Sequence, residues 1–203
     1  MKHFLRTCCF SAVAALLFAA APVWADDDAE DIRLPTPQKS GGMPLLDALA
    51  SRKSSRRTQG ERPTLQQLSD LLWAANGITR PDGKRTAPSA MNRQEIDIAV
   101  LTADGLYEWD EEENKLEREE TREDLSDQLN GSSVFLVFTF DKDDQTPAYA
   151  QVDCGFVGQN VYLYCTSQKW DCVFLGSIDR KKLARALDCD ADEVLYGMRI
   201  GIR

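Results

Sequence analysis

Histidine is almost missing from this chain of 203 residues, in which His3 is the only one. A catalytic triad that uses histidine as its base has no candidate residue beyond that position. The sequence also lacks any Cys-x-x-Cys pair, the spacing typical of structural zinc sites. An acidic run at 110–120 has no rigid ligand spacing, so it is interpreted as a solvated face. We therefore expect no metal site.

Positive charge is the second shortage. The chain has 24 Lys and Arg against 33 Asp and Glu, which gives a formal net charge of -9. A protein that binds DNA or RNA needs a broad basic surface to neutralise phosphates. The composition offers no such surplus, so we expect no nucleic-acid partner.

Long apolar runs are also scarce, and the clearest one lies at the N-terminus. Residues 10–21 are mostly Ala, Leu, Val and Phe, they follow Lys2 and Arg6, and they precede small residues at Val23 and Ala25. This pattern predicts a secretory signal peptide over 1–25 with cleavage after Ala25. The run is shorter than the roughly 20 residues that span a membrane, so we expect no stable anchor after cleavage. The mature chain is predicted to be periplasmic or secreted.

Four cysteines remain in the mature chain: Cys154, Cys165, Cys172 and Cys189. An exported protein can form disulfides. The first two are expected on one helix, about 16 Å apart and too far to bridge. The remaining possibilities are Cys154–Cys172 with Cys165–Cys189, Cys154–Cys189 with Cys165–Cys172, a single bridge, or four free thiols, and the sequence leaves them open.

Residues 26–43 contain Pro and Gly and predict an extended leader that lies along a neighbouring surface, and residues 44–203 predict one domain. Helices are expected from Pro44, over 64–76 with a Thr64–Gln67 capping box, over 117–129, over 153–169, and after Asp179. Strands are expected at 96–102, 106–109, 134–140, 172–175 and 193–202. The 134–140 strand is continuously apolar, which predicts burial on both faces, and the 153–169 helix is apolar enough to lie inside the molecule. The order of elements predicts an α+β domain with a mixed or mainly antiparallel sheet.

A cluster of cations interrupts the acidic composition at Arg52-Lys53-Ser54-Ser55-Arg56-Arg57. Guanidinium, ammonium and hydroxyl groups together suit a phosphate. Cations are also favoured at the C-terminus of a helix, and the cluster taken alone favours a solvated helix end over an anion site.

Three stretches carry a family resemblance: 52–56, 85–95 and 153–176. The first is similar to an Arg-x-Ser-x-Arg/Lys phosphate-binding segment, and the second to an Ala-Pro-Ser-x-x-Asn-x-Gln stretch. The third is similar to a central helix followed by the turn under a flavin ring. In this order they resemble the nitroreductase family, in particular its SagB/ThcOx-like dehydrogenase branch and the short exported members. The resemblance implies a nitroreductase-like α+β fold, with a central mixed or antiparallel sheet flanked by helices around a long buried helix.

The resemblance also implies FMN as the cofactor and a homodimer that shares two flavin sites. It assigns the phosphate to Arg52, Ser54 and Arg56 with help from Lys53, and leaves Arg57 solvated. The resemblance implies that Asn92 reaches the flavin ring across the dimer interface, with Pro88 and Ser89 forming a wall of the site. It also implies that backbone N–H groups near Leu175 and Gly176 approach the N5 and O4 edge of the flavin. Asn92 and Gly176 are also compatible with ordinary turn residues.

The chain departs from the family pattern in three places. Leu175 stands where relatives often have a polar residue, and Arg93-Gln94-Glu95 replaces a more usual apolar or Pro-bearing run. The sequence stops at Arg203, where relatives often continue with a further cation for the phosphate. Arg203 itself is the candidate substitute for that cation.

The resulting prediction is an exported FMN-dependent oxidoreductase that passes hydride or electrons from a small-molecule donor to an electron-poor acceptor such as a nitro compound or a quinone. Flavin chemistry needs no side-chain acid or base here, so no catalytic residue is assigned. Two alternatives remain open: an azoline-type peptide dehydrogenase of the same fold, and a degenerate family member that binds flavin or another ligand without turnover.

Overall fold

A computed structural model describes residues 31–142 and 146–203. The predicted signal peptide at 1–25 and the first part of the predicted leader lie outside these residues. The described chain forms a seven-stranded sheet in the order β1-β4-β3-β2-β5-β7-β6. All of its strand pairs are antiparallel. The predicted α+β class is therefore confirmed.

The strands are β1 (Ile32–Arg33), β2 (Ile96–Thr102), β3 (Gly105–Asp110), β4 (Lys115–Arg118), β5 (Val134–Phe140), β6 (Asp171–Leu175) and β7 (Val194–Gly201). The helices are α1 (Leu45–Ser51), α2 (Leu65–Asn76), α3 (Ser126–Leu129), α4 (Pro147–Gln168) and α5 (Arg180–Ala186), with a 3-10 turn, η1, at Ala90–Asn92. None of the helices within the described ranges is both long and apolar enough to cross a membrane.

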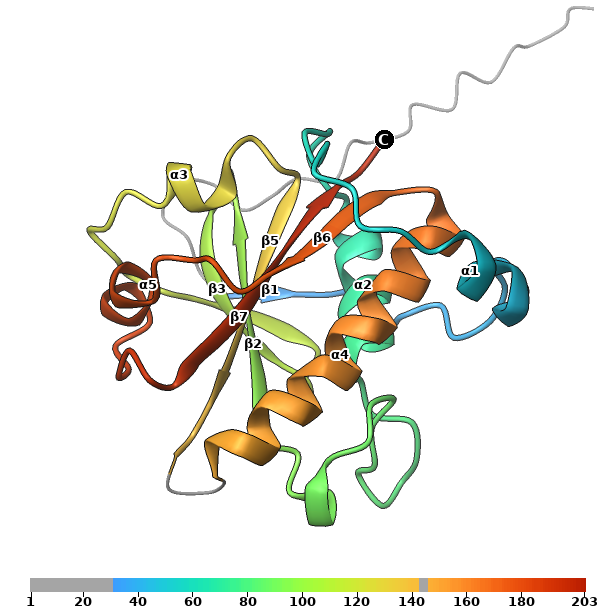
Figure 1. The fold of residues 1–203 in the computed structure, drawn as a ribbon, viewed down its shortest axis with the longest axis horizontal. Helices are drawn as coiled ribbons and strands as arrows, with labels where there is room; N and C mark the ends of the chain where they lie inside the picture. The colour runs from blue at the N-terminus through green and yellow to red at the C-terminus, as the bar shows by residue number, and fades with distance from the viewer. Residues whose placement is uncertain (1–30, 143–145) are drawn as a thin grey trace, which may run out of the picture.

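Helices cover both faces of the sheet. In Figure 1, α2 and α4 lie together on one side, with α1 next to α4, and α3 and α5 lie on the other side. Strand β5 supplies both cores by alternation: Leu136 and Phe138 join the core under α2 and α4, whereas Phe135 and Val137 join the core under α5. This confirms a central strand that is buried on both faces.

Local signals in the sequence explain several helix ends. Thr64 and Gln67 form the predicted capping box of α2, and each side chain accepts a hydrogen bond from the backbone N–H of the other residue. Asp179 caps α5 by accepting from the Lys182 N–H at 3.0 Å. Pro147 at the first turn of α4 starts this helix six residues earlier than predicted.

The prediction of a charged helix over 117–129 is wrong. Residues 115–118 instead form β4, which pairs with β3 on one side and β1 on the other, and only Ser126–Leu129 is helical. The pairing buries Leu116 completely, and this outweighs the weak helical pattern of the charged residues. Residues 32–34 of the predicted leader are extended as expected, but they lie on the chain's own sheet, where Ile32 pairs with Leu116.

The prediction that the central helix lies wholly inside is also wrong for a single chain. Helix α4 buries Cys154, Val157 and Val161, but Tyr149, Val152 and Phe156 on its other face are exposed, Phe156 by 44%. The four cysteines of the described residues are free thiols.

Candidate functional site

The basic cluster lines an open hollow of about 670 Å³ at the end of α1. Its lining contains four cations, Lys53, Arg56, Arg57 and Arg203, and one carboxylate, Asp171. The segment is held beside β6 because the Ser55 N–H donates to the Cys172 carbonyl at 2.8 Å. The hollow is thus a positively charged site on an acidic protein, and it carries serine hydroxyls beside the cations. A phosphate group fits this donor set.

Tyr162 of α4 joins this segment to β6. Its hydroxyl lies 2.7 Å from the Ser54 hydroxyl and accepts the Phe174 N–H at 2.9 Å. The Arg52 guanidinium lies over the same ring, 5.1 Å from its centroid. One side chain therefore fixes both the start of the basic segment and the end of β6.

The predicted phosphate ligands divide into two groups. Lys53, Ser54 and Arg56 line the hollow, whereas Arg52 is stacked on Tyr162 and is not part of the lining. Arg57 is exposed, as a solvated residue would be, but it does line the hollow. Arg203 also reaches the hollow, where it forms an ion pair with Asp171. Arg203 therefore lies in the same hollow as the cations of residues 53–57.

The residues predicted to approach the flavin ring, Leu175 and Gly176, lie at the end of β6. Leu175 is half-buried and Gly176 is exposed. A Cβ at Gly176 would meet only the Tyr196 ring, at 3.6 Å, which is ordinary contact distance. Packing within the chain thus does not require glycine at this position, and the open surface leaves room for a flat ligand. Gly158 differs, because a Cβ at this position would lie only 2.5 Å from the Phe174 ring.

Asn92 and its neighbours lie elsewhere in the chain. Asp153, near the start of α4, accepts the Ala90 N–H at 2.7 Å, which fixes the turn that carries Pro88, Ser89 and Asn92. Asp153 precedes Tyr162 by nine residues, about 14 Å along a helix. A single chain therefore does not bring these three residues to the hollow. The Asn92 side chain contacts the Gln94 side chain at 3.4 Å rather than capping a backbone group.

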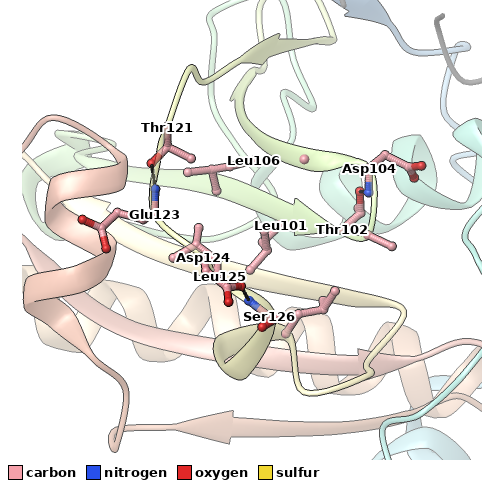
Figure 2. Close-up of a pocket in the computed structure, with 12 residues that line it drawn as sticks. Leu101, Thr102, Asp104, Leu106, Thr121, Glu123, Asp124, Leu125 and Ser126 are labelled. Carbon is pink, nitrogen blue, oxygen red and sulfur yellow. Dashed lines mark hydrogen bonds between the residues drawn. The ribbon is translucent and has the colours of Figure 1, made fainter. Parts of the chain in front are cut away.

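A second hollow, of about 450 Å³, lies on the α3 and α5 side of the sheet and is drawn in Figure 2. Its floor is formed by leucines, and its rim carries acidic side chains. Asp104 pairs with Arg62, and Glu123 pairs with Arg185. The dashed bonds in Figure 2 show that nearby backbone N–H groups are bonded to Thr102, Thr121 and Asp124. None of the predicted site residues lines this hollow.

The sequence did not assign roles to Tyr162 and Asp171. Tyr162 stands 108 residues after Ser54, so no local pattern signals their contact. Asp171 is an acidic residue in a cationic hollow, and its ion pair with Arg203 explains its presence there.

Comparison with known proteins gives consistent results. The model of the nitroreductase family matches residues 49–202. A protein of Methanocaldococcus jannaschii assigned as a nitroreductase is 28% identical over 172 residues, which cover 74% of this chain and 85% of that protein.

Two solved structures are similar in fold. One, from Ralstonia eutropha JMP134 and also assigned as a nitroreductase, has a TM-score of 0.78 and 30% identity, and the match covers 90% of this chain and 93% of the other. The other, from Desulfovibrio desulfuricans and solved in complex with FMN, has a TM-score of 0.57 and 21% identity, with coverage of 79% and 87%.

Proposed function

The chain belongs to the nitroreductase family, and from this premise we propose that it is an exported FMN-dependent oxidoreductase that acts as a homodimer. Family membership makes it a flavin oxidoreductase with FMN as cofactor. The observation that carries the assignment to this site is the cationic hollow of residues 53–57, which Tyr162 connects to the strand end at Leu175 and Gly176.

The residues present fit FMN at both ends. Lys53, Arg56 and Arg203 would hold the phosphate, and the Ser54 hydroxyl would add a neutral donor. The exposed Gly176 would admit the ring, since no side chain of its own occupies that surface. Bound FMN supplies hydride and electron transfer. The protein residues bind and orient the cofactor, and no side chain is assigned as acid or base.

The homodimer is supported by exposed apolar residues on α4 and on elements that contact it. They are Leu45, Leu46 and Leu49 of α1, Met91 of η1, and Tyr149, Val152 and Phe156 of α4. Large apolar side chains that are exposed on neighbouring elements are typical of interfaces. If two α4 helices packed antiparallel, the Asp153 end of one helix would lie beside the Tyr162 end of the other. Asn92 of the partner copy would then approach the hollow, which one chain alone does not achieve.

Export is proposed from the signal-like residues 1–25. The proposed acceptors are electron-poor compounds such as nitro compounds and quinones, and oxidation of azoline peptides is the alternative for the same site. Two turnover assays of the same flavoprotein distinguish these activities: the reduced form is mixed with nitro compounds or quinones, and the oxidised form is mixed with azoline peptides. Turnover of neither substrate class would favour a family member that binds flavin without turnover.

The test of the site is the visible absorption of the purified mature protein together with FMN titration. We expect a yellow protein. Arg56→Ala should weaken FMN binding about 10- to 100-fold, since a hydrogen bond to a charged group contributes about 1.5–3 kcal/mol. Arg122→Ala, an exposed arginine before α3, is the matched control and should bind FMN normally. A colourless protein that takes up no FMN at micromolar concentration would disprove the proposal.

The dimer is tested separately by light scattering during gel filtration. Val152→Glu combined with Phe156→Glu places two charges on the exposed face of α4 and should yield monomers that bind FMN weakly. Gln151→Glu adds a charge at an exposed neighbouring position of the same helix and should stay dimeric. A wild-type chain that is monomeric while it binds FMN would contradict the shared site.

A further inference from the structure

The turn of residues 89–94 is held in an unusual backbone conformation. Met91, Asn92 and Gln94 have φ angles of 53°, 55° and 60°, in the left-handed region that side chains other than glycine seldom adopt. Three such residues in one short turn persist only where surrounding contacts fix them.

Two side chains bond the backbone of this turn. Asp153 accepts the Ala90 N–H at 2.7 Å, and the Ser89 hydroxyl accepts the Gln94 N–H at 2.9 Å. Asp153 belongs to α4 and is 3% exposed, so its bond fastens the turn to the central helix. A bond from a backbone N–H to a buried carboxylate is among the stronger hydrogen bonds in proteins.

A second buried carboxyl group, Glu95, lies near Asp153: its two chain neighbours, Gln94 and Ile96, line the same small cavity as Asp153, and the two carboxyl groups interact electrostatically. Glu95 is 6% exposed, and neither of its side-chain oxygens receives a hydrogen bond from a donor among the described residues. Burial raises the pKa of Glu95, and the neighbouring Asp153 raises this pKa further, whereas the backbone N–H of Glu95 and the Arg93 guanidinium lower it. Two ionised carboxylates side by side repel each other, and one proton between them removes that repulsion.

The small cavity beside Asp153 leaves no room for a larger neutralising group. A cavity of about 10 Å³ is lined by Ser89, Gln94, Asp153 and their neighbours. This volume is at the lower limit for a single water molecule, so a hydrated cation does not fit. A proton is the species that the geometry accommodates.

Among the described residues, the charged groups that act most on Glu95 are Arg93, in the turn, and Asp153, on α4. Helix α2 presents Asn76, a neutral amide that donates to the Ile96 carbonyl at 3.2 Å. Arg85 bonds the Gln94 side chain and is itself paired with Glu111.

We propose that Glu95 and Asp153 share one proton, and that this carboxyl pair locks the turn of residues 89–94 onto α4 and thereby positions Asn92. The Glu95 carboxyl donates its proton to one Asp153 oxygen while the other accepts the Ala90 N–H. Loss of the proton to solvent leaves two negative charges in contact and loosens the turn. Both residues are positioning residues, and neither touches the cofactor. The effect on flavin rests on the proposed function, whereas the lock itself does not.

The sign of the pH dependence follows from the direction of the shift. Because the pKa of Glu95 is raised in the folded protein, the lock is fully formed below the ordinary glutamate range and is lost as pH rises through the raised pKa. The loss of one proton changes a linked equilibrium by at most about tenfold per pH unit.

Two readouts test the lock. The first is hydrogen exchange of the Ala90 N–H, measured by NMR from pH 4.5 to 8 and corrected for the intrinsic exchange rate. Wild-type protection should fall as pH rises, by up to about tenfold per unit above the Glu95 pKa. Glu95→Gln, whose amide donates to Asp153 at every pH, should keep the protection and remove its pH dependence. The second is the FMN dissociation constant. It should rise with pH in the wild type and stay constant with pH in Glu95→Gln.

Controls keep the outcomes distinct. Glu112→Gln, an exposed glutamate on the β3–β4 turn, should retain the wild-type pH dependence. If Glu95→Gln fails to fold, Asp153→Asn supplies the same comparison because its amide can donate to Glu95. Wild-type Ala90 protection that does not vary with pH would overturn the proposal, as would a pH dependence that Glu95→Gln preserves. A protein that binds no FMN would contradict the proposed function, while the amide measurement would still decide the lock.

Discussion

Removal of the Tyr162 hydroxyl is the sharpest perturbation of the site that leaves the core packing in place. Tyr162→Phe keeps the ring under Arg52 but deletes two contacts, one with the Ser54 hydroxyl at 2.7 Å and one with the Phe174 N–H at 2.9 Å. The Phe174 N–H is left without its partner in a half-buried position, and Ser54 loses its anchor to α4.

The magnitude follows from these two losses. A lost hydrogen bond costs about 0.5–1.5 kcal/mol, and a partly buried donor left unpaired adds to this, so the free energy of unfolding should fall by about 1–3 kcal/mol. For a domain of this size each kcal/mol lowers the melting temperature by about 2–4 °C, which gives a total of about 2–12 °C. Because Ser54 lines the hollow, FMN affinity should fall as well, by about tenfold.

Thermal melts and FMN titrations of Tyr162→Phe, Ser54→Ala and the double variant measure the coupling. If the hydroxyl contact orders the basic segment, the two single effects on FMN affinity should sum to more than the double effect. Tyr164→Phe is the matched control, because it lies on the same helix and its hydroxyl bonds no described residue. Additive effects, or a Tyr162→Phe protein with unchanged melting temperature and FMN affinity, would refute the reasoning.

Three further predictions test the glycines and thiols. Gly176→Ala should leave the melting temperature unchanged, since its Cβ meets only Tyr196 at 3.6 Å, but it should weaken FMN binding measurably in the same titration. Gly158→Ala places a Cβ 2.5 Å from the Phe174 ring and should cost about 1–3 kcal/mol in a denaturant melt; an unchanged midpoint would contradict this close packing. Burial and nearby acids raise the pKa of Cys189 to about 11, so alkylation of this thiol at neutral pH should be slow in the native protein and should accelerate as pH approaches that value.

Much of the fold could be predicted because its signals are local or periodic. The apolar run of β5, the capping box at Thr64 and the Asp179 cap each depend on residues a few positions apart. Strand β4 escaped prediction because Lys115–Arg118 has almost no apolar residues, and its state is decided by pairing with β1 and β3. The pairing with β1 joins residues more than 80 positions apart, which no local pattern encodes.

The candidate site also combines residues that a local pattern predicts with contacts that only the packing of distant elements creates. Lys53, Ser54 and Arg56 lie within four consecutive residues, so a site of cations and hydroxyls could be predicted from them, and all three line the hollow. The contacts of Tyr162 and of Asp171 with Arg203 arise only from the way α4 and β6 pack. The buried pair of Glu95 and Asp153 has the same origin, since one member directly precedes β2 and the other lies on α4.

The apolar pattern of α4 describes an assembly better than it describes one chain. A helix that is apolar on all sides is expected to be buried on all sides, yet Val152 is 56% exposed and Phe156 is 44% exposed. Gly155 between them has no atom within 4 Å of where its Cβ would lie, so the surface there is open to a close neighbour. On the proposed dimer a second α4 covers this face, and the sequence pattern and the structure agree. The same packing would bring the turn of residues 89–94 of one copy to the phosphate hollow of the other. Burial of α4 and completion of the flavin site would then be one event, so a substitution that separates the copies should also release the cofactor.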